Sequence, residues 1–563
     1  MTKKTVFETK EPSIQEFSNP MTITDQMQLF KGSPVISISI ATTGEDPLSN
    51  KITSIAIGAP DRSPFMIDMT QSRPEEMVTF LKQLLGSPSE KVFYDAKKAI
   101  NFFYVAGIEI NGPIYDLMLA DKILGAGEGE KKRVFNGIVM EYLGTAVSID
   151  STLSTIANVA ALLLKLREVT IPMLQENNLM STATLEFECI RAVAGMERNG
   201  IRVNNNKLLE MLQELAQRKD FFTKDLHEKI GIINLNSRKE VLEALHKQGI
   251  MVADTRQETL HQFMMPHVWL LNYFSYKKVA YDCSIAKGLL ARINANTGRL
   301  HPQYSQIGAP TGRFSCSNPN LHAIPREEKF RSCFIAADDH KLMIADYSQI
   351  ELRIVAEISQ DERMVYAYKM GEDLHRLTAA LVTGESIADV GKGKKSFAEV
   401  VSLGLIYGMG AKKLAEYSLS NHGVTMTLQQ AEEFRRKFFS AYQGVAQWHE
   451  DVKLRSNYET RTLGNRRMLW QNYYSVNFLK APIQGTAADI LKKALCILHE
   501  RIKGSGTKII GCIHSEIITE APIAETDKAA EILKESMIDA GKIYLKTVPV
   551  VVDVSIGDNW SEK

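Results

Sequence analysis

Two apolar segments that lie far apart in the sequence constrain the fold more than any other feature. Residues 341–348 read KLMIADYS, and residues 508–520 read KIIGCIHSEIITE. Short apolar runs of this kind are typical of buried β-structure. We expect the two segments to pair in one sheet, although a long, largely helical region separates them. The polar side chains Asp346, Ser515 and Glu516 would then meet on that sheet.

Length and composition indicate a multidomain intracellular protein. A chain of 563 residues is too long for one hydrophobic core. The formal net charge of +1 gives no overall attraction for a polyanion, so any DNA site must be a local basic surface. The six cysteines form no CxxC pair, which predicts reduced thiols. Since no run of 18 apolar residues and no signal-peptide pattern occurs, we expect no membrane association and a cytoplasmic location.

The first third of the sequence predicts an α/β domain. Residues 35–40 and 52–57 read as two strands joined by a turn. Helical patterns and a charged, Gly-rich loop follow: helices near 74–85, 96–106 and 115–124, and the loop at 125–132. From about residue 180 onward, long amphipathic helical patterns dominate instead.

Four motifs together resemble those of family A DNA polymerases of the DNA polymerase I type, and they occur in the same order as in that family. They are TGRFS (311–315), DYSQIELR (346–353), LIYGM (405–409) and QGTAADI (484–490). The resemblance is dense over about 180–563, holds in outline over 31–170, and includes no 5′-nuclease domain. It implies an α/β multidomain fold, in which an RNase H-like 3′–5′ exonuclease-type domain precedes a right-hand polymerase domain.

The resemblance also predicts domain limits. They are an N-terminal lead-in at 1–30, a vestigial exonuclease-like domain at 31–175 and a polymerase domain at 176–563, with the thumb at about 204–290, the palm at about 291–360 and 471–563, and the fingers at about 361–470.

In this family an Asp on a strand and an Asp on a hairpin hold two catalytic Mg²⁺ ions about 4 Å apart. The resemblance implies that Asp346 and the backbone carbonyl of Tyr347 bind the metal ions. The second Asp of the family is replaced by Ser515 in this sequence. A serine hydroxyl is an uncharged, weaker ligand for Mg²⁺, and Mn²⁺ is a possible substitute. Glu516 is adjacent, but consecutive strand residues face opposite sides. We expect a rate lower by roughly 10³ or more.

The resemblance places the incoming nucleotide on one face of a helix that ends at Tyr407. Steps of four residues give Leu403, Glu399 and Lys395, which share that face. Glu399 stands where the family has a Lys that pairs with the triphosphate. The attraction between one Lys and the triphosphate at about 6 Å is worth roughly 3 kcal/mol at an effective dielectric near 20. With Glu399 in place of the Lys, repulsion of the triphosphate replaces that attraction.

The segment GKGKK (391–395) leaves two interpretations open. It is either a solvated loop, or its lysines compensate for Glu399 if the helix slides. The remaining positions implied for nucleotide binding are Gln349, Glu351 and His375. Glu351 matches the family's steric gate, which favours deoxynucleotides and argues against an RNA-synthesising relative.

Further residues match the family's contacts to primer and template. Arg313, Gln484 and His514 would lie at the primer terminus, where donors can test the shape of the minor groove without reading sequence. Arg466 and Arg467 form a small basic cluster that either touches template phosphates or is a solvated turn.

The exonuclease-like domain is expected to be inactive. Aligned on the family pattern, the four metal-binding carboxylates become Ser39, Ala41, Ala99 and Val159. Three acids remain nearby, at Asp95, Asp116 and Asp121, but their spacing fits no complete set. We therefore expect a scaffold without 3′–5′ exonuclease activity.

Two functions remain after this comparison. The first is a monomeric, non-proofreading DNA polymerase that binds primer–template DNA and dNTPs, with weakened catalysis. The second is a polymerase-shaped DNA-binding protein without catalysis, which Ser515, Glu399 and Leu403 favour. The sequence leaves open whether a cell or a virus encodes the protein; in a cell it would work at the nucleoid.

Overall fold

The chain folds into two compact units. Unit 1 comprises the residues up to Leu124 and Lys131–Ile190, and unit 2 comprises Gly125–Glu130 and Arg191–Lys563. The computed structural model describes residues 30, 32–70, 75–126, 134–146, 153–383, 385–422, 426–454, 458–470 and 476–563. The predicted lead-in at 1–30 therefore lies almost wholly outside the described residues, as does most of the predicted loop at 125–132.

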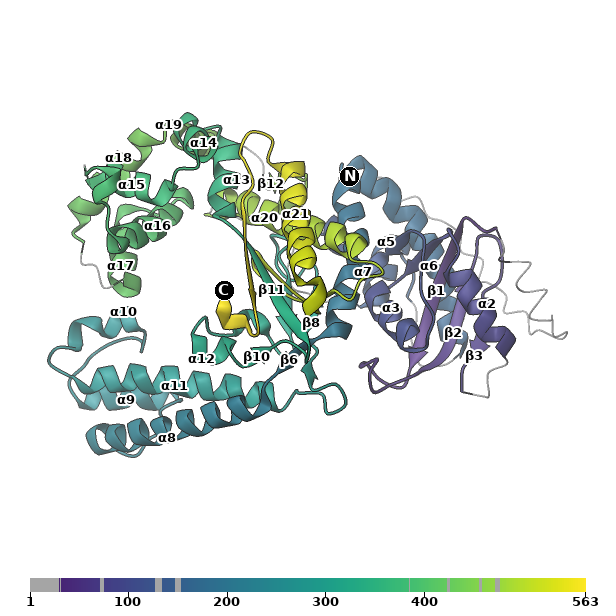
Figure 1. Ribbon diagram of the computed structural model, residues 1–563, viewed down its shortest axis with the longest axis horizontal. Coiled ribbons are helices and arrows are strands. Elements are labelled where there is room, and N and C mark those ends of the chain that lie inside the picture. The colour runs from purple at the N-terminus through teal and green to yellow at the C-terminus, as the bar shows by residue number, and fades with distance from the viewer. Residues whose placement is uncertain are drawn as a thin grey trace. The chain divides into compact units, whose positions relative to one another are not determined.

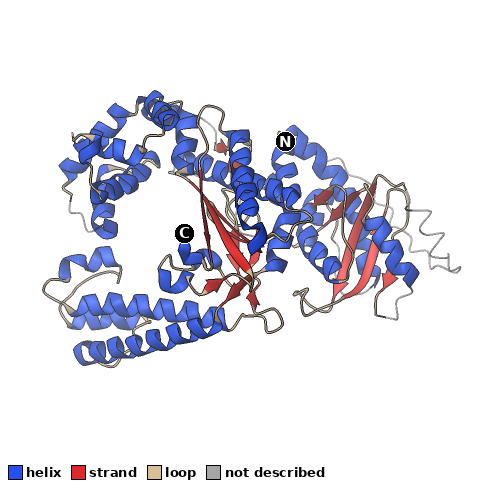
Figure 2. Ribbon diagram, viewed as in Figure 1, coloured by secondary structure: helices blue, strands red, loops and turns tan. Residues whose placement is uncertain are grey.

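The described part of unit 1 is built around a five-stranded sheet of order β3-β2-β1-β4-β5 (Figure 2). Its strands are β1 (Val35–Thr42), β2 (Ile52–Gly58), β3 (Phe65–Asp68), β4 (Glu90–Phe93) and β5 (Ile114–Asp116). The first three strands pair antiparallel, and β4 and β5 continue the sheet parallel to β1. The two strands predicted at 35–40 and 52–57 are confirmed.

Helices flank this sheet, with bounds α2 (Glu75–Leu85), α3 (Ala96–Val105), α4 (Leu117–Leu124), α5 (Phe135–Leu143) and α6 (Leu153–Glu176). Helix α6 contacts β1 and β2, and the Ser37 hydroxyl donates a 2.6 Å hydrogen bond to the Ala160 carbonyl. The helix predicted at 115–124 begins two residues late. Asp116 ends strand β5, and its carboxylate accepts the Leu119 amide at 2.8 Å, which caps α4.

Helix α7 (Met180–Asn199) crosses from unit 1 into unit 2. The predicted domain boundary at 175/176 coincides with the end of α6, whereas the compact unit extends to Ile190. The first half of α7 belongs to unit 1 because it packs there: the Phe187 ring lies 5.0 Å from that of Tyr115.

The segments of unit 2 that the sequence predicts as the palm contain a four-stranded sheet of order β14-β15-β11-β16. Its strands are β11 (His340–Tyr347), β14 (Lys508–Ile513), β15 (Glu516–Pro522) and β16 (Val552–Gly557). The two apolar segments do pair, as predicted, through β11 and β15. Segment 508–520 forms a hairpin, because His514 takes a left-handed φ of 55° in the turn.

Helices α13 (Ile350–Ser359), α20 (Asn477–Arg501) and α21 (Thr526–Tyr544) complete the palm (Figure 1). Helix α21 contacts β11 and β16, and the Tyr347 hydroxyl donates a 2.7 Å hydrogen bond to the Met537 carbonyl. This contact fixes the end of β11. Because side chains alternate along a strand, Tyr347 faces α21 and Asp346 faces the other side.

Smaller sheets and short helices surround the palm. They are β6 (Ile201–Val203), β7 (Arg299–Leu300) and β10 (Phe334–Ile335) in one sheet, β8 (Gln303–Ser305) with β9 (Ser315–Ser317), β12 (Glu459–Arg461) with β13 (Arg467–Leu469), α12 (Glu328–Arg331) and the 3₁₀ turn η5 (Trp560–Glu562).

The segment predicted as the thumb contains helices α8 (Asn205–Ile230), α9 (Arg238–Lys247), α10 (Gln257–Leu260) and α11 (Trp269–Leu290). Helices α8 and α11 lie side by side (Figure 1). Leu226, Leu245 and Tyr273 belong to a buried cluster that joins these helices. Asn204 and Ser237 cap α8 and α9 through hydrogen bonds to backbone amides, which explains where those helices begin.

The segment predicted as the fingers contains helices α14 (Glu362–Met370), α15 (Leu374–Thr383), α16 (Lys392–Ile406), α17 (Ala411–His422), α18 (Leu428–Ala441) and α19 (Gln443–Leu454). The loop interpretation of GKGKK is wrong, because α16 begins at Lys392. All six cysteines are free and buried. A search of the described residues for a helix long and apolar enough to cross a membrane found none.

Candidate active site

The strand register brings two acids from distant parts of the sequence together. Asp346 near the end of β11 lies directly opposite Glu516, the first residue of β15. Residues opposite each other on paired strands project from the same face. The Glu516 side chain is buried, at 3% exposure, whereas Asp346 is partly exposed. The arrangement gives one accessible carboxylate next to one buried carboxylate.

Ser515 adds a hydroxyl group to this pair. It lies in the turn that precedes β15, and its Oγ donates a 2.7 Å hydrogen bond to Oδ1 of Asp346. The expectation that Glu516 and Ser515 must face opposite sides is wrong. Strand alternation does not extend into the turn, so both side chains reach the surroundings of Asp346.

Lys563, the last residue of the sequence, provides a cation that sequence reasoning missed. Its Nζ donates a 2.6 Å hydrogen bond to Oδ2 of Asp346 and another to Oε2 of Glu516. Burial lowers the pKa of Lys563, but the two carboxylates more than offset this and raise it above the ordinary value. The ammonium group therefore bridges the two acids. The contact between distant parts of the chain depends on tertiary folding, so no local pattern signals it.

Glu516 has further partners that keep it in place. Its Oε1 accepts a 2.6 Å hydrogen bond from Nε1 of Trp560, and Arg331 lies 3.7 Å from its Oε2. The guanidinium of Arg331 also stacks over the Trp560 ring at 4.3 Å. A buried carboxylate is costly without such partners, and these contacts hold Glu516 in place beside Asp346.

The donor set fits a divalent metal ion with oxygen ligands. The carboxylates of Asp346 and Glu516 both accept hydrogen bonds from the ammonium group of Lys563, and the Ser515 hydroxyl donates to the carboxylate of Asp346. These are hard oxygen donors of the kind that Mg²⁺ and Mn²⁺ bind. Nowhere in the described ranges do three or more His, Cys, Asp or Glu side chains gather as a metal site.

A third acid lies close in the sheet register without joining this pair. Asp553 on β16 is the neighbour of Asp346 on the side away from Glu516, and it is exposed. Sequence reasoning did not single it out. An available signal was the lone acid in the apolar run VPVVVDVS.

Four of the predicted nucleotide- and DNA-binding residues meet in one hydrogen-bond network. The Tyr407 hydroxyl and the Arg313 guanidinium each donate to a different oxygen of Glu351. Gln484 lies within hydrogen-bonding reach of the same phenol. Burial, followed by the charge of Glu351, raises the pKa of Tyr407. Since the phenol stays protonated, it remains a donor to Glu351.

Helix α16 ends at this network. Tyr407 is the residue that caps α16, and one and two turns earlier lie the half-buried Leu403 and the exposed Glu399. Lys395 belongs to the same helix, but its side chain lies outside the described part of the structure. Lys394 forms an ion pair with Glu385. The roles assigned to Lys395, Glu399 and Leu403 stay predictions.

Two other predicted nucleotide-binding residues are firmly held. Gln349 adopts a left-handed φ of 53° before α13, and its Oε1 accepts a 3.1 Å hydrogen bond from the Tyr368 hydroxyl. His375 in α15 is 4% exposed. A phosphate contact by His375 would therefore need a change in its surroundings, and that role stays a prediction.

The basic pair Arg466–Arg467 is not a solvated turn. Arg466 is buried, and its Nε and guanidinium contact Oδ1 of Asp489 at 2.8 and 2.7 Å. This ion pair leaves Arg466 little surface for template phosphates, whereas Arg467 is half-buried on β13. His514 is exposed in the hairpin turn, with its ring 5.4 Å from that of His322.

The four positions predicted to replace exonuclease carboxylates lie on β1, α3 and α6 of unit 1. Ala41 packs against a cluster of Ala56, Ile156 and Ala160. Ser39 lies on β1, Ala99 is buried in α3 and Val159 is half-buried in α6.

The three acids near these positions have structural partners. Asp95 caps α3 by accepting the Lys98 amide, and Asp121 accepts the Tyr142 hydroxyl at 3.0 Å. Asp116 accepts the amides of Ala96 and Leu119, while burial and the charge of Asp95 raise its pKa to about 8. Each acid therefore supports the local fold.

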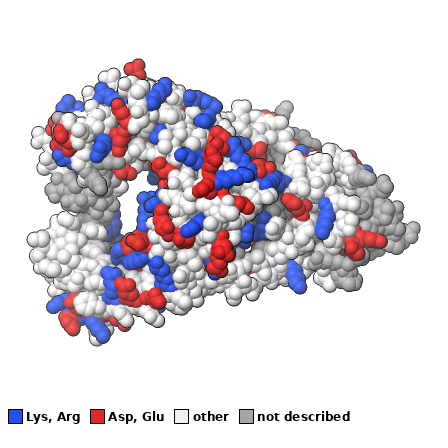
Figure 3. Space-filling view, viewed as in Figure 1, with Lys and Arg blue, Asp and Glu red and all other residues white. Residues whose placement is uncertain are grey.

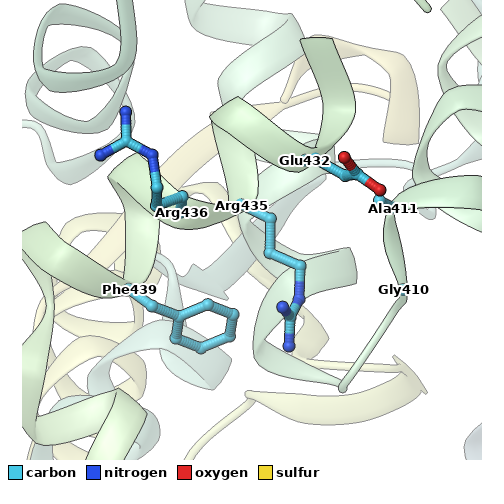
Figure 4. Close-up of a pocket in the computed structure, with 6 residues that line it drawn as sticks. All are labelled: Gly410, Ala411, Glu432, Arg435, Arg436 and Phe439. Carbon is cyan, nitrogen blue, oxygen red and sulfur yellow. The ribbon is translucent and has the colours of Figure 1, made fainter. Parts of the chain in front are cut away.

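Surface charge and surface shape add little to the identification of the candidate active site. On the face that Figure 3 shows, acidic and basic side chains are interspersed. An open pocket in the fingers is lined by Gly410, Ala411, Glu432, Arg435, Arg436 and Phe439. Arg435 extends beside the Phe439 ring, 5.2 Å from its centre, and Arg436 extends away from it (Figure 4). This exposed cation–aromatic pair is typical of protein surfaces.

Comparison with known proteins identifies the family. The family model described as DNA polymerase family A matches residues 205–562, and a 3′–5′ exonuclease model matches residues 14–165. DNA polymerase I of Aquifex aeolicus is 30% identical over 94% of this chain and 96% of its own length. DNA polymerase I of Caldicellulosiruptor bescii is 31% identical over 86% of this chain, which spans 59% of that relative.

A solved structure agrees with these matches. The POL domain of Pol1 from M. smegmatis, in complex with DNA primer-template and dNTP, has a TM-score of 0.88 and 26% identity over 95% of this chain and 97% of its own. The predicted fold class, an exonuclease-type domain followed by a polymerase domain, is confirmed. This chain is a member of DNA polymerase family A.

Proposed function

We propose that this chain is a DNA-directed DNA polymerase that binds primer–template DNA and dNTPs, extends primers slowly and does not proofread. The observation that carries the proposal is the meeting of Asp346, Ser515 and Glu516 on the palm sheet. Family membership supplies the reaction class, and these side chains supply the local chemistry. The metal ion in this proposal is Mg²⁺, with Mn²⁺ as a possible substitute.

The palm residues account for both the reaction and its weakness. Asp346, Glu516, the Ser515 hydroxyl and the Tyr347 backbone carbonyl would hold the two divalent ions. When bound, one ion would supply activation of the primer 3′-oxygen and the other neutralisation of charge on the leaving pyrophosphate. Ser515 offers no negative charge and directs its proton to Asp346. The transition state is therefore less stabilised, and we expect a rate lower by roughly 10³.

The hydrogen-bond network around Glu351, together with Glu399 of α16, accounts for substrate choice. Glu351, held by Tyr407 and Arg313, would crowd the sugar 2′ position and favour deoxynucleotides. Arg313 and Gln484 would donate to minor-groove acceptors that all base pairs share. Glu399 would repel the triphosphate, which raises the KM for the incoming nucleotide.

Lack of proofreading follows from the residues of unit 1. Ser39, Ala41, Ala99 and Val159 stand where carboxylates would bind metal ions. Asp95, Asp116 and Asp121 are committed to helix caps and a tyrosine contact. Unit 1 would then serve as a scaffold.

Ser515 and Glu399 also favour a second function, a polymerase-shaped DNA-binding protein without catalysis. Gel-based primer extension with Mg²⁺ and then Mn²⁺, run beside a DNA-binding titration, separates the two. Slow extension that Asp346→Asn abolishes supports the polymerase. Tight primer–template binding without extension in either metal supports the binding protein and contradicts our proposal.

A further inference from the structure

We propose that Lys563 is a tethered cation that occupies the carboxylates of Asp346 and Glu516 and must leave before a divalent ion binds there. This inference rests on the proposed function, because it concerns the same palm site. It begins from one contact: Nζ of Lys563 donates to Oδ2 of Asp346 at 2.6 Å and to Oε2 of Glu516. The ammonium group thus uses the oxygens that a metal ion would need.

The surroundings of Lys563 deliver its side chain to this place. Trp560 is fully buried, packs edge-on against Phe334 with ring centres 5.2 Å apart, and donates to Oε1 of Glu516. Asn559 caps the following 3₁₀ turn through the Ser561 amide. An anchored turn therefore precedes a lysine that is itself 33% exposed. The backbone is fixed, while the side chain can swing into solvent.

Charge counting gives the direction of the effect. Asp346 and Glu516 contribute two negative charges, and Lys563 cancels one of them. The neutral Ser515 adds none, and Arg331, 3.7 Å from Oε2 of Glu516, is present whether or not Lys563 is, so the ammonium group makes the site one charge unit less negative than it would be without Lys563. A divalent ion must displace the ammonium group and break its two hydrogen bonds. Both effects weaken metal binding, and the ion pairs with Lys563 are shielded from solvent on the Glu516 side.

Manganese binding measured by electron paramagnetic resonance tests this competition without relying on catalysis. The unmodified chain, Lys563→Gln and Lys563→Arg would be titrated with Mn²⁺ in the absence of DNA. Lys503→Gln is the matched control, because Lys503 pairs with Glu500 at an exposed site. The same titrations on an Asp346→Asn background identify the fraction of binding that belongs to the palm.

We expect Lys563→Gln to bind Mn²⁺ at least about tenfold more tightly, with Lys563→Arg and Lys503→Gln close to the unmodified chain. Asp346-dependent binding of equal strength in Lys563→Gln and the unmodified chain would overturn the role of Lys563 and leave the polymerase proposal intact. If neither protein shows Asp346-dependent binding, the metal-dependent polymerase proposal fails as well.

Thermal unfolding in metal-free buffer provides a second measurement. Lys563→Gln removes a cation from buried Glu516, so its Tm should lie below that of the unmodified chain. Saturating Mn²⁺ should close this gap, because the metal ion replaces the lost positive charge. A gap that Mn²⁺ leaves unchanged would contradict the competition.

Discussion

Ser515 donates a 2.7 Å hydrogen bond from Oγ to Oδ1 of Asp346, while Lys563 holds the other oxygen of the same carboxylate. Both oxygens of the exposed palm acid are thus engaged by the chain itself. An aspartate at 515 would add a negative charge here, repel Asp346 and attract a metal ion. Serine replaces that repulsion with a hydrogen bond. The metal-free palm is consequently more stable, and its affinity for a metal ion is lower.

Reversing the charge of Glu399 should improve nucleotide binding. Glu399→Lys removes a repulsion and adds an attraction to the triphosphate, although solvent screens both at an exposed position. We expect the KM for dNTP to fall by about tenfold or more, as measured by steady-state primer extension. Glu416→Lys on the exposed part of α17 makes the same charge change elsewhere and should leave KM unchanged. Equal effects of the two variants would refute a specific role for Glu399.

Unit 1 should not degrade DNA from the 3′ end. Labelled single-stranded DNA incubated with the protein and Mg²⁺ or Mn²⁺ is expected to keep its full length, because Ser39, Ala41, Ala99 and Val159 bind no metal ion. Asp116→Asn tests one of the three acids that remain near these positions. It should change the stability of the domain, while the DNA keeps its full length. Progressive shortening by the unmodified chain would show that another set of acids is active.

Breaking the buried ion pair between Arg466 and Asp489 should destabilise the palm and disturb primer binding. Arg466→Met leaves Asp489, which is 1% exposed, without its cation, and should cost about 3–5 kcal/mol in the free energy of unfolding. A Cβ on Gly312 would meet Nε of Arg466 at 2.5 Å, so the loop that carries Arg313 packs directly on this guanidinium. Primer–template affinity should fall as well.

Urea unfolding and a DNA-binding titration measure these two effects. Arg501→Met is the matched control, because Arg501 pairs with Asp539 at an exposed position and should cost less than about 1 kcal/mol. A similar loss of stability in both variants would contradict the claim that the buried ion pair of Arg466 contributes more to stability than an exposed one.

Acidification should weaken the fingers through His449. Burial lowers the pKa of His449 from 6.5 to about 4, and its Nε2 donates a 2.9 Å hydrogen bond to the carbonyl of Ile406, next to Tyr407. Between pH 6.5 and 4 the unfolded chain takes up a proton that the folded chain excludes. The free energy of unfolding should therefore fall as the pH decreases through this window, by up to about 3 kcal/mol.

Tryptophan fluorescence during urea unfolding at pH 7 and pH 4.5 checks this dependence. His449→Gln keeps a donor for Ile406 but cannot take up the proton, so the slope with pH should become shallower. Some slope should remain, since burial and His514 also lower the pKa of His322 to about 4. An unchanged slope in His449→Gln would contradict the assignment.

The sequence predicted those features that short-range patterns control. The strands at 35–40 and 52–57 and the α16 face with Glu399 and Tyr407 follow from periodicity and motif order. The apolar character of β11 and β15 predicted two buried strands, and their pairing was implied by the resemblance to family A polymerases. These predictions succeed because side-chain alternation and helical repeat are local properties.

The remaining features depend on tertiary contacts. The burial of Arg466 against Asp489 requires two segments to meet, and nothing near Arg466 in the sequence announces it. The same holds for Lys563 on Asp346. The side-chain direction of Glu516 was predicted wrongly, because strand alternation was applied across a turn. Long-range contacts and turn geometry therefore limited the sequence-based account of the site.

The most direct test of this account is the rate of single-nucleotide primer extension by the unmodified chain and by Ser515→Asp, with Mg²⁺ at saturating dNTP. The added carboxylate restores a charged metal ligand, so we predict a rate increase of about 10²–10³. Ser515→Ala, which lacks both hydroxyl and charge, should stay as slow as the unmodified chain. Equal rates for the unmodified chain and Ser515→Asp would contradict the central claim that a missing charge at 515 limits catalysis.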